Sequence, residues 1–190
     1  MRGEYTEDKT FDKTDYSKNP LPKGEYENCR FVNCDFSNSD LTDVKFSECE
    51  FKTCNLSMAK LLATAFRNIK FRDCKMLGLH FEDCNNIGLT VGFENCNLNH
   101  SSFYKTKLKK TIFRNSKLQE TDFSECDLSN SMFDNCDFSG AIFDNTILEK
   151  ADFCTSYNYL IDPETNRIKK ARFSQAGIAG LLAKYDIEIE

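Results

Sequence analysis

Ten cysteines are the residues of this chain with the widest chemical repertoire, because thiolates bind metals, attack electrophiles and form disulfides. Nine of them occupy one position of a five-residue pattern, where side chains are small and are predicted to face inward; only Cys154 departs from it. Cysteines placed in this way behave as small buried hydrophobic residues. We therefore predict reduced structural thiols, with a metal site and a regulatory disulfide as the alternatives.

The two histidines, His80 and His100, occupy outward positions of the same pattern on nearby coils. The pattern places no cysteine or carboxylate beside them that would complete a zinc site or activate a nucleophile. The sequence also contains neither a Gly-x-Ser-x-Gly motif nor a glycine-rich phosphate loop. These observations predict surface histidines, no catalytic residue, no metal or cofactor, and a protein that is not an enzyme.

Charge is unevenly distributed along the 190 residues, whose formal net charge is −5. Residues 60–117 carry 11 basic and 4 acidic side chains, whereas residues 118–153 carry 1 basic and 9 acidic side chains. The single cation of this second segment is Lys150. The nine carboxylates form an acidic face that we predict to bind a partner: Glu120, Asp122, Glu125, Asp127, Asp134, Asp137, Asp144, Glu149 and Asp152.

Charges of opposite sign recur at the same outward position about 20 residues apart. One such column contains Arg72, Glu94, Arg114 and Asp134, and another contains Asp83, Lys105 and Glu125. Opposite charges paired across neighbouring strands stabilise a sheet by roughly 0.2–1 kcal/mol each. The basic segment is therefore predicted to be a partly neutralised surface. Direct nucleic-acid binding is disfavoured, because Tyr104 is the only aromatic residue that this segment is predicted to expose.

A five-residue repeat must position all of these side chains. Every one of the 17 phenylalanines falls into one of two frames of period five, from Phe11 to Phe81 and from Phe93 to Phe173, offset by two residues. Leucine fills most of the other central positions, and Ala, Cys, Ser or Thr usually stands two residues earlier. A period of five with two inward positions fits neither a helix nor an alternating strand. It predicts short extended pieces joined by corners.

A step of 20 residues reveals the larger unit. With the two-residue insertion allowed once, one column contains only phenylalanine: Phe11, Phe31, Phe51, Phe71, Phe93, Phe113, Phe133, Phe153 and Phe173. Such a column predicts coils with four sides of five residues each. Coils stacked about 4.8 Å apart, as neighbouring strands are, give about eight coils in a rod roughly 38 Å long.

With these repeats the chain resembles the pentapeptide-repeat family over roughly residues 26–153. The resemblance implies an all-β fold, a right-handed quadrilateral β-helix, and its handedness agrees with the general rule for parallel crossovers. We expect the β-helix to occupy residues 1–173 and a C-terminal capping helix and tail to occupy residues 174–190. The frame shift predicts a bulge or a small outward loop near residues 86–92, where Gly88 and Gly92 stand.

Both ends of the predicted rod carry signals of their own. Pro20 and Pro22 are expected to blunt the first coil, and residues 187–190 alternate like a short strand. Ser174 can cap a helix over the following residues, and such a helix would cover the open edge of the last coil. Its apolar face is predicted to form a homodimer interface: Ile178, Leu181, Leu182 and Tyr185. Gly177 and Gly180 would permit close approach of the second chain.

The resemblance also suggests a function. The quinolone-resistance and gyrase-inhibiting members of the family are acidic rods that dimerise through their C-terminal caps, which implies a DNA-mimicking binder of a type II topoisomerase such as DNA gyrase. Two departures count against it, because the chain lacks large outward loops and because residues 60–117 are basic. The alternative is a structural scaffold or interaction rod with another partner. No secretory signal and no membrane span is seen, so the cytoplasm is the expected location.

Overall fold

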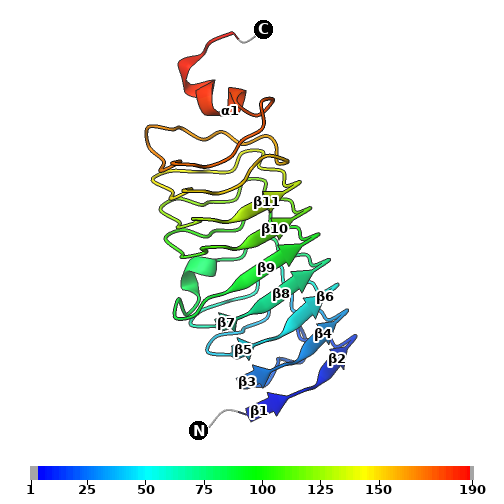
Figure 1. Ribbon diagram of the computed structural model, residues 1–190. Coiled ribbons are helices and arrows are strands. Elements are labelled where there is room, and N and C mark those ends of the chain that lie inside the picture. The colour runs from blue at the N-terminus through cyan, green and yellow to red at the C-terminus, as the bar shows by residue number, and fades with distance from the viewer. Residues whose placement is uncertain (1–3, 189–190) are drawn as a thin grey trace.

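The computed structural model describes residues 4–188, which form a parallel β-solenoid with one short helix at its C-terminal end (Figure 1). The strands of this solenoid are short: β1 Glu4–Glu7, β2 Thr10–Asp12, β3 Gly24–Glu27, β4 Arg30–Val32, β5 Lys45–Ser47, β6 Glu50–Lys52, β7 Ala65–Arg67, β8 Ile69–Arg72, β9 Val91–Glu94, β10 Ile112–Arg114 and β11 Met132–Asp134. The helical elements are η1 Phe81–Asp83, α1 Ala179–Leu182 and η2 Ala183–Tyr185. The prediction of an all-β solenoid is confirmed.

Four ladders of parallel pairing run along the solenoid, one on each side of the coil. We number the faces 1 to 4 in chain order; in one turn their central residues are Phe31, Phe36, Leu41 and Phe46. Face 1 carries the seven-stranded sheet β11-β10-β9-β8-β6-β4-β2, and face 4 carries the four-stranded sheet β1-β3-β5-β7. Faces 2 and 3 are held by isolated parallel bridges, such as Asp35 with Asn55 and Asp40 with Lys60. The predicted four sides are therefore observed.

The phenylalanine column of face 1 is a continuous aromatic stack inside the solenoid. Consecutive rings lie 4.6–5.5 Å apart between centroids, from Phe11 to Phe173. The seven inner rings are fully buried, whereas Phe11 and Phe173 are partly exposed because each has a coil on one side only. From Phe11 to Phe153, each ring also meets an aromatic ring of another face edge to face, as Phe113 meets Phe103 of the opposite face 3 at 6.1 Å.

Most corners of the coil are made by a residue in the left-handed region, two positions after a central residue. Asn33, Asn38, Asp43 and Glu48 fill this position in one turn, with φ between 54° and 62°. Asn and Asp tolerate this conformation better than other residues do. On face 1 the corner amides also bond to one another along the rod, since Asn135 donates to Asn115 and Asn115 to Asn95. The left-handed corners cost conformational energy, and these hydrogen bonds offset part of that cost.

The nine pattern cysteines are buried and Cys154 is half-buried, as predicted, and all ten are free thiols. Four of them stack at the start of face 2, and each donates its thiol hydrogen to the carbonyl of a face 1 phenylalanine one turn earlier, as Cys54 does to Phe31 at 3.3 Å. Burial raises the pKa of the Cys126 thiol to about 12 and that of Cys136 to about 11. Thiols held in this state are poor nucleophiles.

We expect Cys154 to react first with a thiol reagent at pH 8, and the other nine to react only on unfolding. The Asp152 carboxylate raises the pKa of Cys154, so Asp152→Asn should speed its labelling while leaving the other nine protected. Mass spectrometry of the labelled protein gives the number and identity of modified thiols. Cys154→Ser serves as the control and should leave no fast thiol. Rapid labelling of several thiols in the native protein would contradict the assigned burial.

Three local predictions are corrected. The solenoid begins with β1 and β2, before Pro20 and Pro22, so these prolines lie in a connection within the first coil. The outward turn is centred on Ile87 and Gly88, and Gly92 lies inside β9; Leu89 takes the buried place that the frame assigned to Asn86. Residues 187–188 are not a strand, and residues 189–190 lie outside the described residues.

The C-terminal helix is also shorter than expected. It spans Ala179–Leu182, and Ser174 lies outside it, where its hydroxyl accepts a hydrogen bond from the Gly177 backbone in a preceding turn. Backbone pairing of Ile161 with the Gly180 carbonyl at 3.0 Å attaches this segment to the last coil. The division of the chain at residue 173 stays a prediction.

Candidate functional site

The nine acidic residues lie on all four sides of the solenoid, not on a single acidic face. The reason is that five residues turn the chain by one side, so an acidic run of 36 residues winds around the rod. Four of the nine belong to four different ladders: Asp152 is on face 1, Asp137 on face 2, Asp122 on face 3 and Asp127 on face 4. We call the nine carboxylates together the acidic belt.

These same four aspartates have a structural role that sequence reasoning missed. The side-chain oxygen Oδ1 of each accepts the backbone N–H two residues later, at 2.8–3.1 Å, and so closes the next corner. Aspartate and asparagine favour such local turns. Partial burial raises the pKa of Asp137, but hydrogen bonds from Asn158, Gln119 and Ser139 outweigh it and lower the value. The Asp137 carboxylate is therefore held ionised.

Most of the acidic belt is paired with cations. Five carboxylates contact Lys or Arg: Glu125 with Lys105 at 3.5 Å, Asp127 with Lys109 at 3.1 Å, Asp134 with Arg114 at 3.2 Å, Glu149 with Arg167 at 2.6 Å and Asp152 with Arg172 at 2.7 Å. Within residues 4–188, Asp122, Asp137 and Asp144 have no ion-pair partner. The belt is more compensated than its sequence suggests, because Arg167 and Arg172 follow the acidic segment by one coil. Continuing the 20-residue step past residue 153 would have identified them.

The predicted column of alternating charge is confirmed on face 1. Arg72 contacts Glu94 at 3.2 Å, Arg114 reaches Glu94 at 4.0 Å and Asp134 at 3.2 Å. The second column is observed only in its Lys105–Glu125 contact, and Asp83 joins no ion pair within the described part of the chain. Asp83 lies in η1 and does not adopt the left-handed corner conformation that Lys105 and Glu125 share, so its side chain does not join their column.

Each histidine has one carboxylate neighbour, a contact that the repeat pattern did not predict. His80 Nδ1 lies 2.9 Å from Glu82 and His100 Nδ1 lies 3.2 Å from Glu120. Glu120 follows His100 by 20 residues, so the ladder brings the two together, whereas Glu82 is close in sequence. Both histidines are exposed, as predicted. Among residues 4–188, no group of three His, Cys, Asp or Glu side chains could hold a metal ion.

The four residues predicted to form a dimer interface do not share one environment. Ile178 and Tyr185 are 46% and 51% exposed, whereas Leu181 packs against the core of the same chain. Leu182 is half-buried. Other apolar side chains are exposed at this end of the rod: Tyr157, Leu160 and Ile187. An apolar surface thus remains at the C-terminal end, but Leu181 is occupied within its own chain.

The two glycines of the cap serve an internal contact. A Cβ on Gly177 would overlap the Tyr159 hydroxyl, and one on Gly180 would overlap the Tyr159 carbonyl. Lys184 fastens the segment by contacts of 2.7 Å to both Asp162 and Glu164. Close approach by a second chain is therefore not needed to explain either glycine.

No helix within residues 4–188 is long and apolar enough to cross a lipid bilayer.

The sequence matches the model of the pentapeptide repeat region over residues 25–90 and 86–157. No curated protein matches it.

Two solved structures share the architecture. The first is full-length QnrB1, described as a plasmid-mediated fluoroquinolone resistance protein; it is 20% identical, with a TM-score of 0.53, over 97% of this chain and 100% of that one. The second is HetL of the cyanobacterium Nostoc sp. strain PCC 7120, described as involved in heterocyst differentiation regulation. It is 14% identical, with a TM-score of 0.63, over 89% of this chain and 86% of that one. At these identities the likeness shows the fold alone.

Proposed function

Because this chain belongs to the pentapeptide-repeat family, we propose that it is a non-enzymatic rod that imitates DNA and binds a type II topoisomerase such as DNA gyrase. The observation that carries the proposal is the acidic belt, whose carboxylates surround the rod at the spacing of the coils. Rows of fixed negative charge can occupy a basic surface that otherwise binds phosphates. Action on a topoisomerase would place the protein in the cytoplasm.

The unpaired carboxylates are the ones we propose to contact the enzyme. Asp122, Asp137 and Asp144 are negatively charged and lack a cationic partner within residues 4–188. In a homodimer joined at the C-terminal ends, two sets of these carboxylates would flank the centre of one long rod. Fluoroquinolone resistance is a property of QnrB1, and we extend it to this chain only as part of this proposal.

The test is a gyrase supercoiling assay, with and without a fluoroquinolone. We expect the protein to inhibit supercoiling or to protect it from the drug. The triple variant Asp122→Asn, Asp137→Asn, Asp144→Asn should weaken this effect about tenfold, since three surface charge contacts of up to about 1 kcal/mol each are lost. Asparagine retains a side-chain oxygen for the corner hydrogen bonds, so the fold should be kept.

The matched control removes the same charge from the other half of the rod. This control is a second triple variant, which should leave the gyrase effect unchanged because its three aspartates lie outside the belt: Asp35→Asn, Asp43→Asn, Asp73→Asn. Equal loss in both triple variants would point to net charge instead of the belt. No effect of the wild-type protein on gyrase would reject this function and leave the alternative of a scaffold for another partner.

A further inference from the structure

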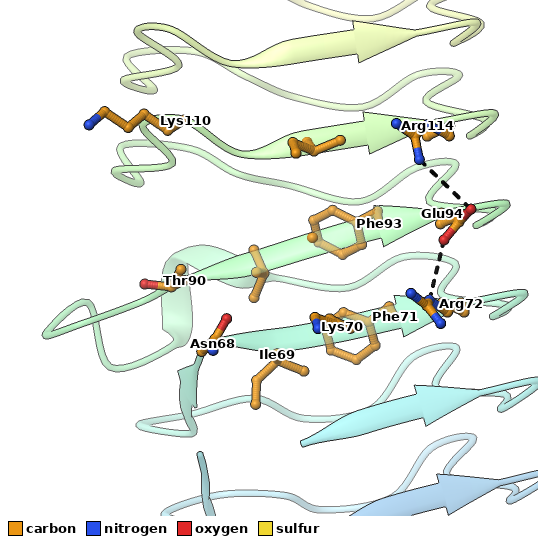
Figure 2. A pocket seen from close by; sticks show the side chains of 13 residues that line it. Asn68, Ile69, Lys70, Phe71, Arg72, Thr90, Phe93, Glu94, Lys110 and Arg114 are labelled. Carbon is orange, nitrogen blue, oxygen red and sulfur yellow. Dashed lines mark ion pairs between the residues drawn. The ribbon is translucent and has the colours of Figure 1, made fainter. Parts of the chain in front are cut away.

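A hollow of about 260 Å³ interrupts face 1 between β8, β9 and β10 (Figure 2). The hollow lies on a column of outward-facing residues, one from each strand. Lys70 on β8 and Ile112 on β10 fill this column with long side chains. Gly92 takes that position on β9. Because coils are about 4.8 Å apart, the missing side chain leaves a gap about two coil spacings wide between Lys70 and Ile112.

The backbone does not require glycine at position 92. Gly92 lies in a regular strand and is not among the glycines with positive φ. A Cβ there would meet only the Ile112 carbonyl oxygen, at 3.9 Å, which is an ordinary contact. Glycine inside a strand weakens it and often marks a place where a ligand or another backbone approaches closely. The gap is therefore a feature that packing within this chain leaves unexplained.

The lining of the hollow combines excess positive charge with apolar surface. Figure 2 shows Lys110 at one end and Arg72, Glu94 and Arg114 at the other. Arg72 and Arg114 share Glu94, whereas Lys70 and Lys110 have no ion-pair partner within residues 4–188. Ile112 and the next residue of the column, Met132, are 47% and 43% exposed.

We propose that this hollow binds a short acidic segment of a partner protein. One aliphatic or aromatic side chain of the segment fills the gap at Gly92 and contacts Ile112, and carboxylates on either side of it reach Lys70 and Lys110. Charge complementarity selects an anion, and the apolar gap selects a peptide side chain. A single-stranded nucleic acid is less suited, because such sites offer aromatic rings for base stacking and none is exposed in the lining.

The test compares two proteins against one displayed library of random peptides. The first is the wild type, and the second carries Gly92→Val, which fills the gap with a side chain that suits a strand. We expect the wild type to enrich peptides with an apolar residue beside two or more acidic residues, and Gly92→Val to lose them. The affinity of a recovered peptide should fall at least tenfold in this variant, while its thermal midpoint stays equal or rises.

Charge variants complete the test. Lys70→Ala with Lys110→Ala should weaken binding of the recovered peptide about tenfold and reduce its dependence on salt. The matched control, Lys75→Ala with Lys107→Ala, removes the same charge from faces 2 and 4 and should bind as the wild type does. Recovery of the same peptides by Gly92→Val, enrichment without acidic residues, or tighter binding of a 20-nucleotide oligothymidine than of the peptide would overturn the proposal.

Discussion

Phe113→Ala should lower the free energy of unfolding by about 3–5 kcal/mol, which is a large part of the 5–15 kcal/mol typical of a native domain. Phe113 is fully buried, with stacked neighbours Phe93 and Phe133 at 4.9 and 5.0 Å. Its removal leaves a cavity in the middle of the aromatic column. Because each coil contacts only its neighbours, such a cavity also weakens the coupling between the two halves of the rod.

Urea unfolding followed by circular dichroism measures this effect. Two controls separate the position from the residue type. Phe113→Leu should cost far less, since leucine fills equivalent central positions at Leu108 and Leu118, both fully buried. Phe11→Ala should also cost less, because Phe11 is partly exposed at the end of the column. An unchanged midpoint for Phe113→Ala would contradict the proposed role of the column.

We expect the chain to sediment as a homodimer that Ile178→Asp converts to a monomer. Ile178 and Tyr185 are exposed at the C-terminal end, and burying two copies of this surface against each other closes the open edges of both rods. An aspartate at position 178 would bury an unpaired charge in the interface, at a cost of several kcal/mol. A substitution of Ile178 tests the interface more directly than one of Leu181, because Leu181 packs against the core of its own chain.

Sedimentation velocity over a range of concentrations gives the oligomeric state, and circular dichroism checks that the β-solenoid persists. Leu62→Asp is the matched control, because Leu62 is 59% exposed on face 3 in the N-terminal half of the rod, away from the C-terminal end. A wild-type protein that stays monomeric at high concentration would reject the dimer. The topoisomerase proposal would then lose its long, continuous rod with an acidic centre.

The sequence by itself determined the core of this protein. The phenylalanine column, the inward cysteines and the four sides all follow from two periods, five and twenty. They could be predicted because every coil has nearly the same length, so lateral neighbours are found by counting. The alternating charges from Arg72 to Asp134 follow for the same reason.

Only the tertiary structure decided what the surface offers. A run of acidic residues looked like one face, but each five-residue step turns the chain to another side and distributes the run around the rod. The cations that pair with Glu149 and Asp152 come from the next coil, 18 and 20 residues later, where the repeat has become irregular. Gly177 and Gly92 show the same limit: one glycine makes room for Tyr159 and the other leaves a hollow. Which of these a glycine does depends on the atoms that face it, and no periodicity in the chain specifies them.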